Sequence, residues 1–324
     1  MSTVPTFRSL VVSEEQAAPE EQILWDLQDL AEFTERPTLL YVSNARSTAP
    51  DATPFPCPED LFLFSDALRQ VEGDRLDLIL NSQGGTPEVA EQLVVFLRGN
   101  ISYIRCFVPH LVTGAAALLA LACNEICLDD RAALGPIEPY VPVTRHLPNG
   151  TTSTEYVSAS AILQGFDHAR ETLREEGEAG LTAYAPLLER YDLHTFELCR
   201  NAVELARELV RQWLKDYMFH DLSARESSVI IRRVLEKFSK PSEFLSPQRP
   251  IGLEAARNCG LRITDLRANS ELRERIWRLY WLTSLLFEQQ RGVYKVCATS
   301  QGLLYLRGEK SVRATLSEGE LRVL

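Results

Sequence analysis

Leu76-Asp-Leu-Ile-Leu-Asn-Ser-Gln-Gly-Gly85 is an aliphatic strand that ends in two adjacent glycines, and this stretch decides the fold. Its strand part, Leu76 to Leu80, is apolar at every position except Asp77. Pro87 follows two residues after the glycines, at the first turn of an amphipathic helix that we expect to run to about Arg98. The pattern predicts a buried strand, a tight turn and a helix in succession.

Similar units lie on both sides of this stretch. Thr38 to Ser43, Ile101 to Val108 and Ile126 to Leu128 read as further apolar strands, and Gly114 to Cys123 as a helix of small residues. Continuously apolar strands that alternate with helices are typical of a parallel sheet covered on both faces. The first half therefore predicts an α/β fold.

The second half is mostly helical by the same criteria. Apolar residues recur at helical spacing in Ser158 to Glu175, Phe196 to Met218, Ser227 to Phe238 and Glu271 to Gln289. The stretch Arg291 to Arg307 reads as a terminal hairpin around Ser300-Gln-Gly302.

The composition excludes several classes of protein. The 324 residues carry 34 basic and 45 acidic side chains, a formal net charge of −11, which disfavours binding to nucleic acid or anionic lipid. No apolar run reaches the roughly 18 to 20 residues of a membrane helix, and the acidic N-terminus is unlike a signal peptide. We expect a cytoplasmic protein with no membrane or nucleic-acid partner.

The acidic charge is concentrated at the N-terminus. Residues 1–36 hold eight acids and two bases, so we describe them as an acidic, partly disordered arm, most of it solvated. Within the arm, the stretch Ile23-Leu24-Trp25 with Leu27, Leu30 and Phe33 has helical spacing and is expected to dock on a neighbour.

Seven cysteines are scattered along the chain without the spacing of a disulfide framework. Cys123 and Cys127 have a spacing that metal sites use, but no second Cys or His pair lies nearby to complete four ligands. We expect buried thiols, no metal and no cofactor.

Two turns are the place where chemistry is expected. Asn81 to Gly85 and Val112 to Ala116 each follow an apolar strand, and ligands of open α/β sheets bind at that edge. Adjacent Gly84 and Gly85 let the backbone approach a substrate and direct N–H groups at an oxyanion, and Ala115 opens the next helix. The alternative is that the two glycines only form a tight turn.

Four blocks in order resemble the Clp-fold serine proteases, closest to the SDH (serine dehydrogenase proteinase) family. They are Leu76 to Gly85, Val108-Pro109, Ala117 to Ile126, and Leu134-Gly-Pro-Ile-Glu-Pro139. The similarity continues to about residue 265 and starts near residue 38. It implies a ClpP/crotonase-like layered sheet with repeated β-β-α type units and a helical C-terminal half.

The resemblance also implies a degenerate catalytic site. The position of the family's nucleophilic serine is Gly114, the family's Gly-Pro-Ile-Asp-Pro aspartate becomes Glu138, and the position of a family histidine is Pro247. Acyl transfer needs a hydroxyl, a base and N–H donors, and only the donors Gly84, Gly85 and Ala115 remain.

Other hydroxyls and bases near the turns are weaker candidates. Thr113 is the fallback nucleophile, although it lies one residue early, and Ser82 is expected to be a turn hydroxyl bonded to its own backbone. His110 and His146 are the nearest histidines in sequence.

The sequence thus supports three functions. The first is a protease homologue without catalysis that binds peptide or acts as a structural subunit of a homo- or hetero-oligomer, with an active paralogue as one possible partner. The second is a serine or threonine peptidase with a displaced nucleophile, and the third is a crotonase-like acyl-CoA enzyme. The domain would span residues 37–265, with a helical arm at about 152–240 and a separate C-terminal helix and hairpin at 266–324.

Overall fold

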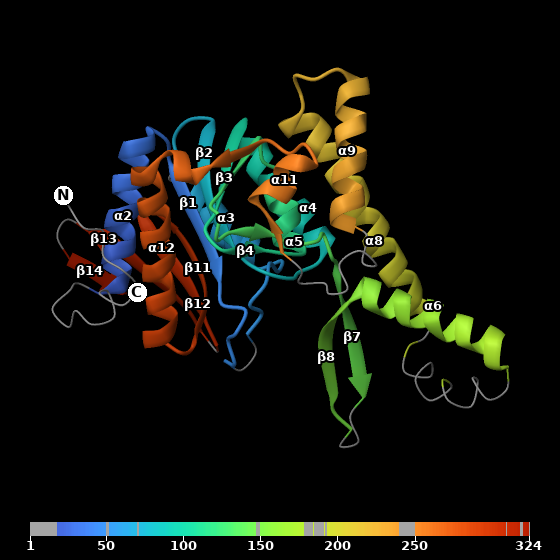
Figure 1. Cartoon of the computed structure of the whole chain (residues 1–324). Helices are drawn as coiled ribbons and strands as arrows, with labels where there is room; N and C mark the ends of the chain where they lie inside the picture. The colour runs from blue at the N-terminus through green and yellow to red at the C-terminus, as the bar shows by residue number, and fades with distance from the viewer. Residues whose placement is uncertain are drawn as a thin grey trace.

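The computed structural model describes residues 18–323 except 50–51, 70, 147–149, 178–183, 185–190, 192, 240–249, 309 and 318–319. It is a mixed α/β structure built on one nine-stranded sheet, in the order β10-β5-β3-β2-β1-β11-β12-β13-β14 (Figure 1). The predicted α/β class and the ClpP-like layered sheet are confirmed. No helix in the described part of the chain is long and apolar enough to cross a membrane.

The parallel half of the sheet contains the strands that the sequence predicted. These are β1 (Thr38–Ser43), β2 (Arg75–Asn81), β3 (Tyr103–Val108) and β5 (Glu125–Leu128). The edge strand β10 (Ile263–Asp265), which the sequence did not predict, pairs with β5. Neighbours pair in parallel through this half, for example Leu40 with Ile79 and Cys106 with Ile126. Each apolar strand is buried on both faces, as its composition indicates.

Helices cover one face of the sheet around the first core. They are α3 (Asp60–Leu68), α4 (Pro87–Asn100), α5 (Ala115–Leu121), α8 (Leu193–Trp213), a π-helical turn η1 (Leu214–Met218) and α9 (Ala224–Ser239). The side chains of Leu39 and Tyr41 point into this core, and those of Leu40 and Val42 into the core on the opposite face. This alternation is the two-residue period of a strand.

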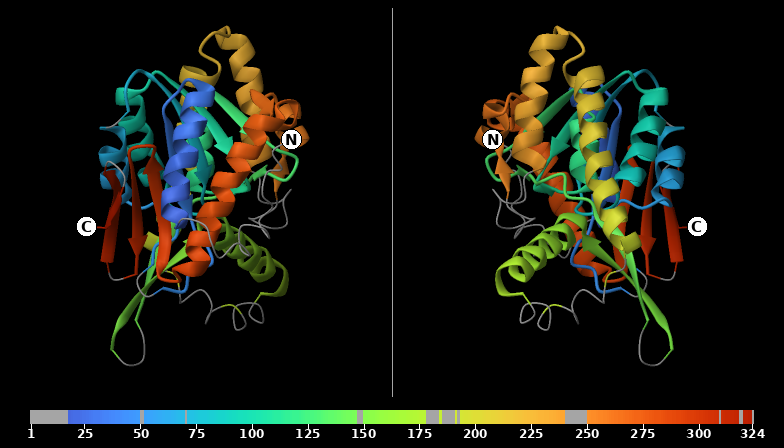
Figure 2. Two further views of the ribbon diagram at one scale, coloured as in Figure 1. Left: turned by 90° about the vertical axis from the view of Figure 1, so that its left-hand side faces the viewer. Right: turned by 90° about the vertical axis from the view of Figure 1, so that its right-hand side faces the viewer.

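The second face is covered by two helices from opposite ends of the chain. Figure 2 shows α2 (Pro19–Thr34) beside α12 (Ser270–Gln289) on this face. Ile23, Leu24, Leu27 and Leu30 of α2 are fully buried. The part of the acidic arm that the structure describes is therefore a packed helix and not a solvated tail.

Two acids of α2, Asp26 and Asp29, pair with arginines of α12. Arg278 Nε donates to Asp26 at 2.5 Å, and Arg275 Nε donates to Asp29 at 2.7 Å. Burial raises the pKa of Asp26, although Arg278 opposes that rise. The charge that suggested a solvated arm instead joins the two helices.

The C-terminal segment extends the same sheet. β11 (Val293–Thr299) pairs antiparallel with β1, β12 (Gly302–Arg307) pairs with β11, and β13 (Lys310–Ser317) and β14 (Glu320–Val323) follow. The hairpin of β11 and β12 agrees with the sequence prediction. Residues from 266 onward do not form a separate unit, because β11 lies beside the central strand β1.

Two small sheets complete the structure. β4 (Leu111–Val112), β6 (Ala133–Leu134) and β9 (Ile251–Gly252) form one beside the short helix α11 (Leu253–Asn258), and a 3-10 turn η2 (Leu266–Ala268) precedes α12. The hairpin of β7 (Tyr140–His146) and β8 (Thr152–Ser158) projects from the sheet domain and leads into α6 (Ala159–Glu176) (Figure 1). A third core, around Val141, Ile162 and Cys199, joins this arm to α8.

Candidate functional site

The two predicted turns meet at the end of β2. Ser82 forms a parallel bridge with Val112, and the Oδ1 atom of Asn81 accepts a hydrogen bond from the Leu111 N–H at 2.9 Å. Gly84 has φ +81° and Gly85 has φ +90°, a backbone region in which a side chain is strained. The turn therefore requires both glycines for its shape.

Gly114, the position of the family's serine, lies directly beside this turn. Its φ is +61° and its ψ is −129°, and its N–H donates to the Pro136 carbonyl at 3.1 Å. A Cβ atom at residue 114 would lie 2.8 Å from the Gly84 oxygen and 3.0 Å from the Glu138 oxygen. A serine side chain does not fit there unless the backbone of both neighbouring loops moves.

The expected oxyanion donors are partly occupied. The Ala115 N–H donates to the Gly84 carbonyl at 2.8 Å, and the Gly84 N–H donates to Thr113 Oγ1 at 3.3 Å. Of the three expected donors, the Gly85 N–H alone makes no hydrogen bond to the described residues. An oxyanion would thus meet one available N–H, whereas an oxyanion hole uses a convergent set of donors.

Thr113, the fallback nucleophile, is buried in this junction. Its hydroxyl accepts from Gly84, and its methyl group packs so closely on Gly135 that a Cβ there would lie 2.3 Å from Cγ2. Within the described part of the chain, no hydrogen bond links the Thr113 hydroxyl to a basic side chain. Among the described residues, Thr113 therefore has no general base that would activate it.

Glu138 has a structural partner instead of a catalytic one. Its Oε1 accepts from the Ser158 hydroxyl at 2.7 Å and from the Ser160 N–H at 2.9 Å. A carboxylate that accepts a backbone N–H in the first turn stabilises the helix terminus. Glu138 therefore ties the site loop to the start of α6, and Pro247 lies outside the described residues.

Ser82 bonds to a neighbouring strand and not to its own turn, which corrects the sequence prediction. Its hydroxyl lies 2.6 Å from the Ser43 hydroxyl, and Ser43 donates to the Pro54 carbonyl at 3.0 Å. Ser82 is fully buried. The two serines thus connect the site turn to the segment that covers it.

That segment, residues Pro54–Cys57, is called the cover below. Phe55 and Pro56 lie on the two glycines: a Cβ at Gly85 would lie 3.0 Å from the Pro56 oxygen, and one at Gly84 would lie 3.4 Å from the Phe55 Cβ. The Phe55 ring also contacts the Tyr156 ring of β8, with centroids 4.6 Å apart. The cover closes the turn where a substrate backbone was expected.

A buried ionic cluster fixes the end of the cover. Lys295 Nζ donates to the two Asp60 carboxylate oxygens at 2.8 and 2.9 Å and to Cys57 Sγ at 3.0 Å. The Tyr41 hydroxyl and the Cys57 N–H also donate to Asp60, at 2.6 and 2.9 Å. Lys295 and Asp60 are fully buried, so this pair is desolvated and satisfied by hydrogen bonds.

The cluster sets the protonation of its members. Burial alone would lower the pKa of Lys295, but Asp60 and Cys57 more than offset it, and the pKa is raised. Burial and the Asp60 charge raise the pKa of the Cys57 thiol, and Lys295 reduces that rise. Lys295 is therefore a permanent cation rather than a base, and Cys57 is a protonated thiol at neutral pH.

Among the described side chains, no histidine is hydrogen-bonded to a hydroxyl of the turns. The His110 side chain is largely exposed, and its ring stacks on the Tyr280 ring with centroids 5.9 Å apart. Partial desolvation by its neighbours and the charge of Arg46 lower the pKa of His110. His146 ends β7, and its side chain is outside the described set. All seven cysteines are buried and unbridged, and no cluster of three or more His, Cys, Asp or Glu among the described residues could hold a metal ion.

The sequence reasoning missed Lys295, Asp60 and the cover. The signal was present, because Lys295 is the single charged residue in the strand Val293–Thr299, which is otherwise apolar or small. A cation in such a strand requires a buried acid. The partner could not be named, since Asp60 lies 235 positions away in the chain.

Comparison with known proteins agrees with the motifs. Residues 62–149 match the family model described as ClpP-like SDH-type serine proteinase. One uncharacterized protein of Methanocaldococcus jannaschii is 25% identical over 192 residues, which is 53% of this chain and 61% of that protein. A second from the same organism is 35% identical over 74 residues, 22% of this chain and 26% of that protein.

These similarities are partial in extent. The chain spans about three fifths of the length of one relative and about one quarter of the other. The match to the family model includes β2, both turns, Gly114 and Glu138, and it ends before β8. No solved structure matches the chain.

Proposed function

We propose that this chain, a homologue of the ClpP-like SDH-type serine proteinases over residues 62–149, is a protease homologue without hydrolytic activity that serves as a binding or structural subunit. The resemblance to the family accounts for the fold and for the two turns. The proposal concerns the function that the chain has in place of hydrolysis.

The observation that carries the proposal is the packing around Gly114. The space for a serine side chain is taken by the Gly84 and Glu138 carbonyl oxygens, at 2.8 and 3.0 Å from the position of a Cβ. Loss of a nucleophile by substitution alone would leave an empty site. Here the neighbouring backbone occupies the position, which supports the absence of the covalent step.

The remaining parts of an acyl-transfer site support the same reading. Thr113 has no hydrogen-bonded base in the described residues, the Ala115 N–H is engaged by Gly84, and Glu138 caps α6. A crotonase-like enzyme would need the same oxyanion donors, so the occupied Ala115 N–H disfavours that function as well.

The projecting arm is the candidate surface for assembly. Tyr156, Leu193 and Leu198 are exposed large apolar residues on β8 and α8. A cavity of about 290 Å³ opens against α6, with Val157 and Phe166 in its lining. Exposed apolar groups near one another are typical of interaction sites. A homo-oligomer or a hetero-oligomer with an active paralogue would cover this surface.

A fluorophosphonate probe and a casein-hydrolysis assay test the absence of catalysis. We expect no labelling and no hydrolysis by the purified chain, by the Thr113→Ala variant or by the Ser82→Ala variant. Labelling of the wild type that disappears in Thr113→Ala and survives in Ser82→Ala would establish a displaced nucleophile and overturn the proposal.

Two further measurements address the rival functions. Calorimetry with coenzyme A should detect no binding, and tight binding would support the crotonase-like alternative. Light scattering at increasing concentration should show an oligomer, and a clean monomer at high concentration would remove the proposal that the chain assembles with itself.

A further inference from the structure

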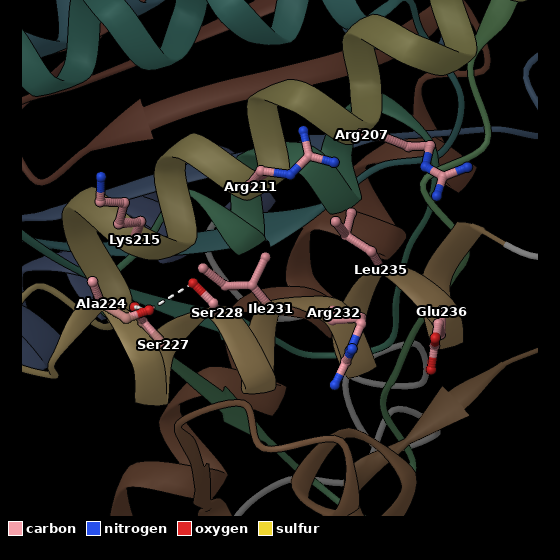
Figure 3. Close-up of a pocket in the computed structure, with 10 residues that line it drawn as sticks. All are labelled: Arg207, Arg211, Lys215, Ala224, Ser227, Ser228, Ile231, Arg232, Leu235 and Glu236. Carbon is pink, nitrogen blue, oxygen red and sulfur yellow. Dashed lines mark hydrogen bonds between the residues drawn. The ribbon is translucent and has the colours of Figure 1, made fainter.

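A groove between α8 and α9 carries a concentration of positive charge. Figure 3 shows Arg207 and Arg211 of α8 followed by Lys215 of the turn η1, with Ile231 and Leu235 of α9 between the two helices. The groove has a volume of about 650 Å³, within the range of ligand-binding clefts. Its remaining lining residues, all on α9, are Ala224, Ser227, Ser228, Arg232 and Glu236.

The cations of α8 and η1 form a line and do not converge on a point. Arg207, Arg211 and Lys215 are four residues apart, so they share one helix face and extend over about 12 Å along the axis. A compact anion such as phosphate is held by donors that converge on it. The line instead fits negative charges that are repeated along a chain.

Most of this charge has no partner within the described part of the protein. Arg211 pairs with Glu208 of its own helix, but Arg207, Lys215 and Arg232 make no ion pair to any described residue. Glu236 is the one acid among the described residues of the lining. In a chain of net charge −11, this groove is a local exception that would attract an acidic ligand.

The floor of the groove is aliphatic. Ile231 and Leu235 are buried at the base, and none of the described residues that line the groove is aromatic. Nucleobases and single-stranded nucleic acid are bound chiefly by stacking on aromatic rings, so the floor does not suit them. It suits the side chains of Leu, Ile or Val.

The serine hydroxyls of the groove are already used as donors. Ser228 Oγ donates to the Ala224 carbonyl at 2.6 Å, and Ser227 Oγ donates to the Ser223 carbonyl at 3.0 Å. Phosphate groups would draw on such hydroxyls, whereas spaced carboxylates need only the three cations.

We propose that the α8–α9 groove binds an acidic peptide segment of a partner protein, with carboxylates on one side and aliphatic residues on the other. Its carboxylates would face Arg207, Arg211 and Lys215, and its aliphatic residues would lie on Ile231 and Leu235. An amphipathic helix laid in a groove between helices is a recurring mode of peptide recognition. The groove is separate from the closed site at Gly114, so this binding does not depend on whether the chain is hydrolytic.

Fluorescence anisotropy with a defined probe tests the proposal. The probe is a fluorescein-labelled helical peptide of 14 residues with Glu along one face and Leu along the other. We expect saturable binding that weakens as salt is raised, and a loss of affinity of about tenfold or more in Arg207→Glu/Arg211→Glu, because each reversal turns an attraction into a repulsion.

The matched control is Arg200→Glu/Arg225→Glu. It makes the same change of charge on α8 and α9, at residues that do not line the groove. It should retain the wild-type affinity, and circular dichroism should show the same helix content in both variants. An equal loss of affinity in the two variants would mean that the effect comes from long-range electrostatic attraction and not from contacts in the groove. That result would overturn the proposal.

Two competitors identify the ligand class. A peptide with every Glu replaced by Gln should not displace the probe, and displacement by it would overturn the role of charge. Tripolyphosphate that binds while the acidic peptide does not would make the groove a phosphate site and overturn the proposal.

The oligomeric state of the groove variant gives a further outcome. If Arg207→Glu/Arg211→Glu dissociates an oligomer and the wild type binds no peptide, the groove is assigned to a second copy of this chain, which also overturns the proposal.

Discussion

The turn around Gly114 and the groove between α8 and α9 differ in how open they are to a ligand. The turn was expected to be open, and it is closed by the cover, by Gly84 and by Glu138. The groove has no signature in the sequence, and it is open, charged and without ion partners for Arg207, Lys215 and Arg232 in the described residues.

The difference shows that a motif similar to that of a family and a usable site are separate properties. The backbone conformation of the turn requires its glycines whether or not the turn takes part in chemistry. Recognition by charge needs solvent access and unpaired groups, and the groove provides both.

The largest expected effect is at the ion pair that holds the cover. Asp60→Asn leaves the buried Lys295 cation without its counter-charge, and we expect the free energy of unfolding to fall by about 3–5 kcal/mol. Urea unfolding measures this change in the free energy of unfolding. The double variant Asp60→Asn/Lys295→Met should recover part of the loss, because the unpaired charge is removed as well.

The control is Asp66→Asn on the same helix, where the ion pair with Arg69 is exposed and should contribute less than about 1 kcal/mol. If Asp60→Asn lowered the free energy of unfolding no more than Asp66→Asn does, the cover would not depend on the buried ionic cluster. The contrast between a closed turn and an open groove would then weaken.

A second prediction concerns the closure of the turn itself. Gly114→Ala places a Cβ against two carbonyl oxygens at a positive φ, and we expect it to destabilise the protein by about 2–4 kcal/mol. Gly99→Ala is the matched control, since nothing lies within 4 Å of its Cβ position near the end of α4. That variant should be neutral or slightly stabilising, and thermal unfolding compares the two.

Should Gly114→Ala unfold at the temperature of Gly99→Ala, the loops around residue 114 would have room to open. The turn would then be an accessible site in solution, and the case for catalytic loss would rest on the missing hydroxyl alone.

The smallest expected effect is a dependence of the stability on pH, which arises at Asp129, directly after β5. Burial would raise the pKa of Asp129, but hydrogen bonds from Arg273 and Trp277 hold it well below its usual range. The unfolded state therefore takes up a proton that the folded state does not. The stabilisation is complete above about pH 4 and declines as the pH falls toward the lowered pKa.

Asp129→Asn should cost about 2 kcal/mol at pH 7 and remove this part of the acid sensitivity. Urea unfolding between pH 7 and pH 3 measures both effects, with Asp167→Asn at an exposed pair as the control. An unchanged pH profile would mean that other carboxylates govern acid unfolding.

Much of the fold could be predicted from the sequence because buried strands have a simple pattern. β1 begins and ends at the expected residues, and β2, α4 and α12 differ by one or two residues. The hairpin of β7 and β8 was missed, since β8 is largely polar and the pair buries little more than Val141 and Val143. The pairing of β13 and β14 was missed as well.

The backbone of the candidate site could be predicted from the sequence, but the closure of the site by the cover could not. Two glycines after an apolar strand indicate the turn, and the helix after Gly114 was expected. The cover could not be foreseen, because its position depends on Lys295, which approaches Cys57 only after β11 has paired with β1. The groove depends in the same way on how α8 packs against α9.

The pairing of β1 with β11 also has a consequence for synthesis of the chain on the ribosome. β1 is complete after residue 43, but its second edge stays unpaired until residue 299 has emerged. An apolar strand with a free edge is a template for pairing with other nascent chains. The protein thus spends most of its translation with its central strand exposed, and a chaperone that shields this edge would raise the yield of folded protein.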